Sequence, residues 1–380
     1  MSGAPAGWVP PAYPYDRLEG LREVAARFEG GAVDLSIGTP TDPPPPAAVE
    51  ALGDPDRAGA LRGYPTSLGS APLRRAIATW LTDTFGLAAG LVGPAAVAAC
   101  VGTKEFVATT PAWMAKRDPG RDTVLYPAVS YPTYAMGAEL AGLRAVPVPL
   151  DAHWRLDLTA VADSDAERAL LLWSNTPGNP AGGLDDLQAV AAWGRHRGIP
   201  VFSDECYCEF TWDGPPRSVL AGGSVEGVVA LHSLSKRSNL AGLRVGWYSG
   251  DPEIVGYLGE VRKHAGLMVP GPAQAAAAAA LTDRAHVDEQ RQRYRSRLER
   301  LAEVLRAGMG LEVGLPAGGF YLWVAAPDGD AWALSAALAD RAGVIASPGE
   351  FYGPAGGGHV RLAVVAPSER IEVVARRLGV

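Results

Sequence analysis

The stretch that decides the fold is residues 228–250, VVALHSLSKRSNLAGLRVGWYSG. An apolar run at 228–231 leads into a polar turn at 233–236, and a second apolar run covers 245–248. This pattern predicts a strand, a functional turn and a second strand. Lys236 lies where the first predicted strand ends, and Arg244 follows it before the second run. We therefore expect a site at the end of this strand.

Lys236 stands out because the chain uses so few lysines. Of 34 Lys and Arg residues only four are lysines, Lys104, Lys116, Lys236 and Lys263. Arginine serves wherever any positive charge is enough, so a retained lysine points to a need for its titratable amine. Taken alone, any of the four is most simply a solvated surface residue. Beside Arg244, however, Lys236 suggests a Schiff base with a phosphate-bearing aldehyde, which is pyridoxal 5′-phosphate (PLP).

Length, composition and charge exclude several classes of protein. A chain of 380 residues exceeds one ordinary domain, which predicts two lobes. Its 48% hydrophobic and 20% charged residues are typical of a soluble globular protein, and its net charge of −7 provides no basic field for nucleic acid. No apolar stretch is long and clean enough to span a membrane, and the N-terminus lacks a signal-peptide pattern. We expect a cytoplasmic protein with no nucleic-acid or membrane partner.

The cysteines predict neither disulfides nor a metal site. There are three of them, Cys100, Cys206 and Cys208. An odd, small number in a chain of this length argues against a disulfide framework. Cys206 and Cys208 are too closely spaced for the usual zinc pair, and no second Cys/His cluster accompanies them. Partly buried thiols near a site are the simpler interpretation.

Short apolar strands alternate with helical patterns through the first two thirds of the chain. Such strands indicate a mostly parallel sheet that helices cover on both faces. Sites in sheets of this kind form at the carboxyl ends of the strands, where Asn179, Asp204 and Lys236 are expected. The predicted strands are 95–101, 123–126, 144–148, 169–173, 199–202, 228–231 and 245–248.

A second, α+β lobe is expected after the Pro-Gly-Pro at 270–272. It starts with a helical tract from 273 to about 305, either continuous or with one break, whose six-alanine run favours helix. An aromatic strand at 320–324, a helix at 331–341, short strands near 344 and 360 and a helix at 368–378 follow. The expected division is an N-terminal segment, 1–45, that packs with the small domain and the site, a large domain, 46–270, and a small C-terminal domain, 271–380.

A possible phosphate cradle precedes the second helix of the large domain. The small-residue strand 95–101 leads into Gly102, Thr103 and Lys104, where a helix begins. Free N–H groups and the positive end of the helix dipole favour an anion at such a place. An ordinary strand-to-helix turn would contain the same residues, so this motif alone does not decide between the two.

Three linked motifs together resemble the class I/II PLP-dependent aminotransferases of fold type I, from Val33 to the C-terminus. The resemblance implies an α/β fold with a large domain, whose mostly parallel sheet is covered by helices, and a smaller α+β domain. It also implies amino-acid and keto-acid substrates and a homodimer with shared active sites. The motifs are Gly178-Asn179-Pro180, Ser203-Asp204-Glu205-Cys206-Tyr207, and Ser233-x-Ser235-Lys236 with Arg244.

The resemblance assigns catalytic and cofactor-binding roles to individual residues. Lys236 would carry the cofactor and shuttle the proton, and Asp204 would pair with the ring nitrogen, so that the ring accepts electrons. Tyr207 and Asn179 would bind the ring oxygen, and Tyr131 would stack on the ring. A turn aspartate, a turn asparagine before proline and a core aromatic are the plainer interpretations of Asp204, Asn179 and Tyr131. The phosphate would be held by Gly102, Thr103, Lys104, Ser233, Ser235 and Arg244, with Tyr64 reaching over from the partner subunit.

Substrate recognition is the least specific part of the resemblance. Gly38, Asn179 and Arg361 would bind the substrate, with Arg361 as a bidentate clamp on its α-carboxylate. Residues 33–45, 101–108 and 233–246 are most similar to actinobacterial N-succinyldiaminopimelate aminotransferases of lysine biosynthesis. This implies glutamate as donor and N-succinyl-2-amino-6-oxopimelate as acceptor. The candidate cations for the distal carboxylate of such substrates are Arg17, Lys104, Arg237 and Lys263.

The sequence departs from the family pattern at two positions, and three other functions have to be weighed against the N-succinyldiaminopimelate aminotransferase. Ala181 stands where the family often has threonine, and Lys104 stands where many members have a small or polar residue. An aspartate or other amino-acid aminotransferase, and a PLP-dependent C–S lyase on the same fold, fit the same motifs. A ligand-sensing regulator would need a basic DNA-binding module, and the first 32 residues are too short and proline-rich for one.

Overall fold

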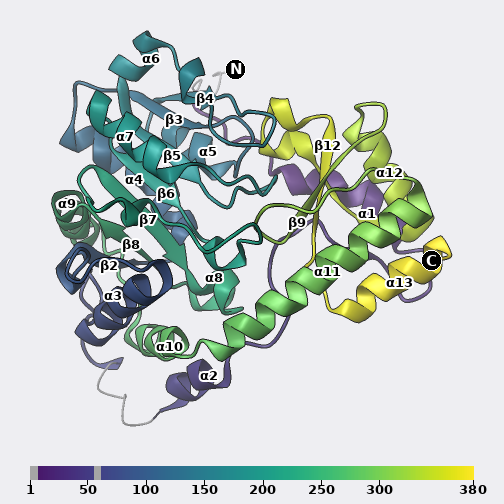
Figure 1. Cartoon of the computed structure of the whole chain (residues 1–380), viewed down its shortest axis with the longest axis horizontal. Coiled ribbons are helices and arrows are strands. Elements are labelled where there is room, and N and C mark those ends of the chain that lie inside the picture. Colours follow the sequence, from purple (N-terminus) through teal and green to yellow (C-terminus); the bar gives the residue numbers. More distant parts are fainter. Residues whose placement is uncertain (1–6, 55–60) are drawn as a thin grey trace, which may run out of the picture.

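The computed structural model describes residues 7–54 and 61–380, which form two lobes that each contain a sheet (Figure 1). The large lobe has seven strands in the order β2-β8-β7-β6-β5-β3-β4. Neighbouring strands from β7 to β4 pair in parallel, whereas β8 runs antiparallel to both β2 and β7. The expected mostly parallel sheet is therefore confirmed. Its strands are β2 (Val97–Cys100), β3 (Thr123–Pro127), β4 (Arg144–Val148), β5 (Ala169–Asn175), β6 (Val201–Asp204), β7 (Val228–Ser233) and β8 (Gly246–Gly250).

Helices cover both faces of this sheet, which explains why its central strands β5, β6 and β7 are buried at every position and begin with apolar runs. In β5, for example, Leu172 packs into one core while Leu171 and Trp173 pack into the core on the other face, and the polar residues Ser174 and Asn175 follow at its carboxyl end. The first core also receives α3 (Ala71–Phe85), α6 (Asp163–Glu167) and α7 (Leu187–Arg197), and the second receives α4 (Thr103–Arg117), α5 (Thr133–Leu140) and α9 (Pro252–His264). Asp186 and Asp251 cap the N-termini of α7 and α9, because their side chains accept hydrogen bonds from backbone N–H groups of the first turn.

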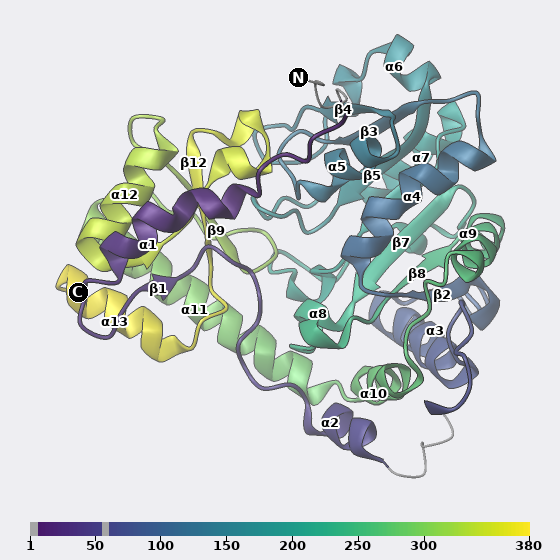
Figure 2. The ribbon, with the colours of Figure 1, turned by 180° about the vertical axis from the view of Figure 1, so that it is seen from behind.

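The small lobe is built on a three-stranded antiparallel sheet in the order β11-β12-β9. Its strands are β9 (Tyr321–Ala325), β11 (Ser347–Pro348) and β12 (His359–Ala363), and its helices are α11 (Ala285–Met309), α12 (Ala331–Ala342) and α13 (Ser368–Leu378). The N-terminal segment joins this lobe, because α1 (Glu19–Ala25) contacts α12 and β1 (Val33–Asp34) pairs with β10 (Val344–Ile345). Figure 2 shows this purple segment crossing from the large lobe to the small one.

The packing of the helix that begins at residue 271 bears on where the large domain ends. The tract predicted from 273 to 305 is divided at Asp283 and Arg284 into α10 (Gly271–Thr282) and α11. The alanines of α10 pack with the large-lobe core and against α3 and α2 (Pro46–Gly53), a helix that the sequence did not predict. Small side chains allow this close approach. We therefore propose that the domain change lies at the start of α11.

The described parts of the chain contain neither a helix that could cross a membrane nor a metal cluster. No helix within 7–54 and 61–380 combines the length and the apolar character that crossing a membrane requires. The same residues contain no cluster of three or more His, Cys, Asp or Glu side chains placed to hold a metal ion. All three cysteines are free.

Candidate active site

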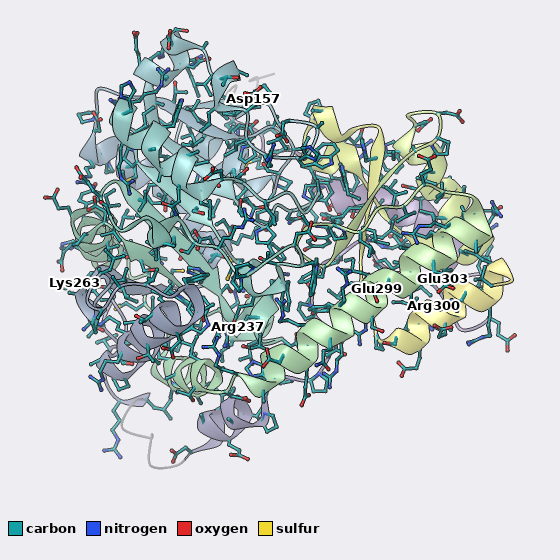
Figure 3. All side chains as sticks on the ribbon, viewed as in Figure 1. Asp157, Arg237, Lys263, Glu299, Arg300 and Glu303 are labelled. Atoms are coloured by element: carbon teal, nitrogen blue, oxygen red, sulfur yellow. The ribbon has the colours of Figure 1, made fainter. Side chains whose placement is uncertain are left out.

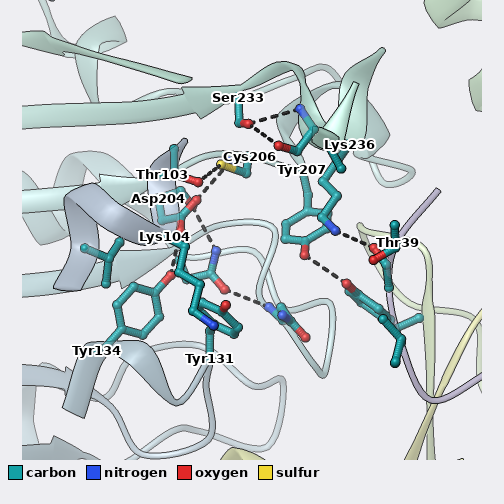
Figure 4. A pocket seen from close by; sticks show the side chains of 18 of the residues that line it. Thr39, Thr103, Lys104, Tyr131, Tyr134, Asp204, Cys206, Tyr207, Ser233 and Lys236 are labelled. Carbon is teal, nitrogen blue, oxygen red and sulfur yellow. Dashed lines mark hydrogen bonds between the residues drawn. The ribbon is translucent and has the colours of Figure 1, made fainter. Parts of the chain in front are cut away.

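A cavity of about 510 Å³ lies at the carboxyl ends of the large-lobe strands and is closed by residues of the small lobe and the N-terminal segment (Figure 4). Residues separated by more than 300 positions in sequence line this one space, among them Gly38 and Arg361. Twelve of the residues that the sequence assigned to the site line it: Gly38, Thr103, Lys104, Tyr131, Asn179, Asp204, Tyr207, Ser233, Ser235, Lys236, Arg244 and Arg361.

Lys236 lies on the short helix α8 (Leu234–Arg237), which directly follows β7. The hydroxyl of Ser233 fixes the start of this helix by accepting a hydrogen bond from the backbone N–H of Ser235 at 3.0 Å. The Lys236 ammonium donates to the carbonyl oxygen of Gly38. Burial, and then the positive charge of Arg361, lower the pKa of Lys236 to about 8. A much larger neutral fraction than usual is therefore present near pH 7, as a nucleophilic amine requires.

Asp204 is the last residue of β6, and its carboxylate lines the floor of the cavity. The Tyr134 hydroxyl donates to Oδ2 at 2.9 Å, and the backbone N–H of Cys206 donates to Oδ1 at 3.1 Å. Burial raises the pKa of Asp204 above its ordinary value, because the charged form is poorly solvated. A cation in the cavity next to Asp204 would compensate this burial.

Gly102 and Arg244 build an anion cradle at the start of α4. Both residues have positive φ angles, 76° and 56°. A Cβ at Gly102 would clash with Nη2 of Arg244, so glycine is needed for the guanidinium to reach this position. The Ser233 and Ser235 hydroxyls line the same cavity. A guanidinium, two hydroxyls and the free N–H groups that begin α4 form a donor set suited to phosphate.

Arg361 is a buried guanidinium on β12 that is held in one orientation. Nη1 donates to Oδ1 of Asn179 at 2.8 Å, and Nη2 donates to the carbonyl oxygen of Ser36 at 2.6 Å. Its Cζ atom lies 4.2 Å from the centroid of the Tyr321 ring. Within the described residues, Arg361 has only neutral hydrogen-bond partners and no carboxylate. A buried cation of this kind favours a carboxylate ligand from the cavity.

Tyr207 faces the cavity beside Lys236 and is held by a second tyrosine (Figure 4). Its hydroxyl lies 2.9 Å from the hydroxyl of Tyr321. Burial raises the pKa of Tyr207 well above its ordinary value, so the phenol remains protonated and can donate a hydrogen bond. Asn179 is oriented in turn, because its backbone N–H donates to Oδ1 of Asn175 at 2.8 Å.

Two predicted site residues do not line the cavity. Gly102 acts by leaving room for Arg244. Tyr64 is 96% exposed and lines a separate groove of about 650 Å³ beside α10. Within one subunit, Tyr64 therefore contributes nothing to the cavity.

Only one of the four candidate cations for a distal carboxylate lines the cavity. Arg17 forms an ion pair with Glu350 at 2.7 Å, and Arg237 forms a buried pair with Glu209 at 2.5 Å. Lys263 lies at the outer edge of the large lobe (Figure 3). Lys104 is the remaining candidate, and its Nζ lies 5.8 Å from the centroid of the Tyr131 ring.

The sequence analysis missed several residues that line the cavity. Tyr134 could have been found, because it follows Tyr131 by three positions, a spacing that places two side chains on the same face of a helical turn. Tyr13 and Tyr15 belong to a proline-rich segment without a periodic pattern, and nothing in their spacing points to the site. The missed residues include Tyr13, Tyr15, Tyr134, Asn175 and Tyr321.

Comparison with known proteins supports one family. The family model of aminotransferases of class I and II matches residues 31–378. A probable aminotransferase of Mycobacterium tuberculosis is 42% identical over 97% of this chain and 85% of its own length. The 4-dedimethylamino-4-oxo-anhydrotetracycline transaminase of Streptomyces rimosus is also 42% identical, over 97% of this chain and 99% of its own length. The structure of a probable N-succinyldiaminopimelate aminotransferase from Thermus thermophilus aligns with a TM-score of 0.84 and 32% sequence identity. The alignment covers 96% of this chain and 99% of that one.

The family uses PLP, and the residues of this cavity fit that cofactor. Gly102 leaves the space that Arg244 needs in the anion cradle, Lys236 has a lowered pKa, and the Asp204 carboxylate faces the cavity. When bound, PLP supplies an electron sink that stabilises negative charge at the α-carbon of an amino acid. By the match over nearly its whole length, the chain belongs to the PLP-dependent aminotransferases of class I and II.

Proposed function

We propose that the protein transfers the amino group of glutamate to N-succinyl-2-amino-6-oxopimelate, as a succinyldiaminopimelate transaminase of lysine and diaminopimelate biosynthesis does. The observation that carries this proposal is Lys104, a cavity-lining ammonium that forms no ion pair with any described residue. Glutamate and the succinylated acceptor each have a carboxylate beyond the one that Arg361 would bind. Lys104 would hold this second carboxylate.

The likeness to the Thermus thermophilus structure supports the same acceptor, since that protein is described as a probable N-succinyldiaminopimelate aminotransferase. At 32% identity, this likeness also agrees with the family. An aspartate aminotransferase would use Arg361 and Lys104 in the same way, with a shorter acceptor. The two functions therefore differ in how well the site binds the succinylated arm.

In the proposed reaction, the residues of the cavity bind and orient the substrate and move one proton. Arg361 and Asn179 would hold the α-carboxylate, while Asp204 would keep a proton on the ring nitrogen of the cofactor. The Lys236 amine would take the proton from the α-carbon of the amino acid and return it two atoms away, as the shuttle of a 1,3-proton shift. Its lowered pKa suits it to both steps. Tyr207 and Asn179 would hold the ring oxygen.

We also propose that the enzyme is a homodimer with shared active sites. Tyr64 is almost fully exposed and lines a groove whose surface is mostly apolar, with Ala278 and Ala279 of α10 on its wall. A second copy would cover this groove and receive the Tyr64 hydroxyl at its phosphate cradle. The exposure of Tyr64 in a single subunit supports this arrangement.

A second acceptor class follows from the Streptomyces rimosus relative, whose name gives an oxo-anhydrotetracycline as its substrate. Tyr13 and Ile37, which are 57% and 46% exposed, line the cavity here. Their apolar surfaces would suit a fused-ring ketone, which needs flat contacts more than a second cation. This alternative predicts that Lys104 has little influence on acceptor choice.

The test compares kcat/KM for four acceptors with glutamate as the common donor: N-succinyl-2-amino-6-oxopimelate, oxaloacetate, pyruvate and the tetracycline ketone. We expect the succinylated acceptor to be preferred. A tenfold preference for oxaloacetate, about 1.4 kcal/mol in transition-state binding, would instead indicate an aspartate aminotransferase. Release of pyruvate and ammonia from an amino acid without any acceptor would indicate a lyase.

A matched pair of variants tests the role of Lys104. Lys104→Met should lower kcat/KM for the succinylated acceptor by about tenfold to hundredfold, because a charge-assisted hydrogen bond is lost, and should hardly affect pyruvate. Lys263→Met removes an exposed lysine far from the cavity and should leave all four acceptors unchanged. Equal losses with pyruvate and the succinylated acceptor would contradict a role in distal-carboxylate binding.

A further inference from the structure

The carboxylate of Asp204 is held by a tyrosine that the family motifs do not include. We propose that Tyr134 is a positioning residue that fixes Asp204 and stabilises its negative charge, so that Asp204 can hold the proton on the ring nitrogen of the cofactor. This inference rests on the role of Asp204 in the proposed function. It adds a residue on α5 that acts through Asp204.

The contact is direct and protected from solvent (Figure 4). Tyr134 is 1% exposed and Asp204 is 8% exposed, and the hydroxyl donates to Oδ2 at 2.9 Å. Cys206 is the other partner of this carboxylate, because its backbone N–H donates to Oδ1 at 3.1 Å and its thiol also interacts with Asp204. A carboxylate accepts more than two hydrogen bonds, so each oxygen keeps accepting capacity for a donor in the cavity. Tyr134→Phe removes the hydroxyl donor to Oδ2 and keeps the aromatic ring.

Local structure leaves the Tyr134 ring little freedom. Tyr134 lies in the first turn of α5, Tyr131 lies just before that helix, and both residues line the cavity. On its other side the ring stacks on Trp173 of β5, with 5.4 Å between centroids. Gly137 lets α5 pack closely on α4, because a Cβ there would lie 2.8 Å from the carbonyl oxygen of Val107. The hydroxyl is thereby directed at the end of β6.

The electrostatics of the pair give the hydroxyl a defined role. Burial, followed by the charge of Asp204, raises the pKa of Tyr134 well above its ordinary value, so the phenol remains a donor. Burial also raises the pKa of Asp204, while Tyr134 and Cys206 act in the opposite direction. Without the phenol, Asp204 would be more basic and would draw the shared proton away from the ring nitrogen. The other titratable groups that influence Asp204 or are influenced by it include Cys100, Cys206, His232 and Lys236.

The experiment uses the holoenzyme of Tyr134→Phe, loaded with PLP that is labelled with ¹⁵N in the ring. The ¹⁵N chemical shift reports directly whether the ring nitrogen carries a proton and does not depend on any substrate. At one near-neutral pH, we expect the variant signal to move from the wild-type position toward that of an unprotonated ring. The kcat with glutamate should fall by about tenfold to hundredfold, with a smaller change in KM.

Two further variants make the result specific. Tyr248→Phe removes another buried hydroxyl of the large lobe, one that has no hydrogen-bond partner among the described residues, and it should leave the ¹⁵N signal unchanged. Asp204→Asn should move the signal fully to the unprotonated position. Adding Tyr134→Phe to Asp204→Asn should then cause no further shift, because the tyrosine acts through the carboxylate.

The possible outcomes separate this inference from the proposed function. A wild-type signal in Tyr134→Phe, together with a full shift in Asp204→Asn, overturns the inference and leaves the role of Asp204 intact. A wild-type signal in both variants overturns the ring-nitrogen role of Asp204 and the inference with it. If Tyr134→Phe does not fold, 3-fluorotyrosine at position 134 keeps the shape and donates more strongly. Its signal should move toward the fully protonated position, and an opposite movement overturns the inference.

Discussion

Replacing Lys236 with methionine should make the cofactor-free protein more stable at pH 7, although it removes the amine on which the proposed reaction depends. Burial of the ammonium, followed by the positive charges of Arg361 and Arg244, lowers the pKa of Lys236 from 10.5 to about 8. The folded protein therefore disfavours the charged form relative to the unfolded chain. Methionine fills a similar volume and has no charge, so the variant avoids this unfavourable term.

The size of the effect follows from the displaced pKa. A change from 10.5 to about 8 corresponds to about 3 kcal/mol of destabilisation at pH 7. The variant also loses the hydrogen bond to the carbonyl oxygen of Gly38, a loss of about 1 kcal/mol. The expected net gain is about 2 kcal/mol. The destabilisation by the buried ammonium is complete below pH 8. It decreases between pH 8 and 10.5, where the amine of the folded protein loses its proton, and it is absent above that range.

Urea unfolding of cofactor-free wild type and Lys236→Met, at one protein concentration and at pH 7 and pH 9, measures this directly. We expect the gain of the variant at pH 9 to be about half of that at pH 7. Lys263→Met is the matched control, because it removes an exposed lysine and should change stability by less than about 0.5 kcal/mol at either pH. A less stable Lys236→Met protein at pH 7, or a gain that does not depend on pH, would refute the reasoning.

Two further predictions concern the proposed roles of Asp204 and Tyr64. Asp204→Ala should still bind PLP, seen by absorbance, while transamination falls by several orders of magnitude, about 5 kcal/mol or more in barrier; a loss below tenfold would show that another group holds the ring proton. Mixing inactive Lys236→Ala with inactive Tyr64→Ala should restore roughly a quarter of wild-type activity, because half of the dimers are hybrids with one intact site. A fully active monomer in gel filtration would contradict the shared site.

The sequence predicted the large sheet well because its pattern is local. Apolar runs such as 169–173 and 228–231 become central strands that are buried on both faces. Motif residues that follow these strands meet in one cavity, because parallel strands present their carboxyl ends at the same edge. The seventh strand, β8, lies close to its predicted position in the chain. Its antiparallel direction depends on the path of the connection through α8, and the pattern of apolar residues does not show that path.

Features that depend on contacts between distant segments could not be predicted in this way. The alanines of α10 fit a helix of either lobe, and only packing against α2 and α3 shows to which one they belong. The sequence likewise proposed four cations for a distal carboxylate. Ion pairing to Glu350 and Glu209, which are distant in sequence, removes Arg17 and Arg237 from consideration. Charge alone does not report which partners a side chain already has.

The 25-residue helix α11 has a mechanical consequence. At 1.5 Å per residue it is a rod of about 37 Å, and its first residue follows the interruption at Asp283 and Arg284. Near that end Arg291 bonds the backbone of the large lobe at Thr211, while the far end packs against α13. A tilt of only about 5° about the interruption would carry the far end by about 3 Å. A slight adjustment beside α10 would therefore displace the lobe that carries Arg361 by several ångströms.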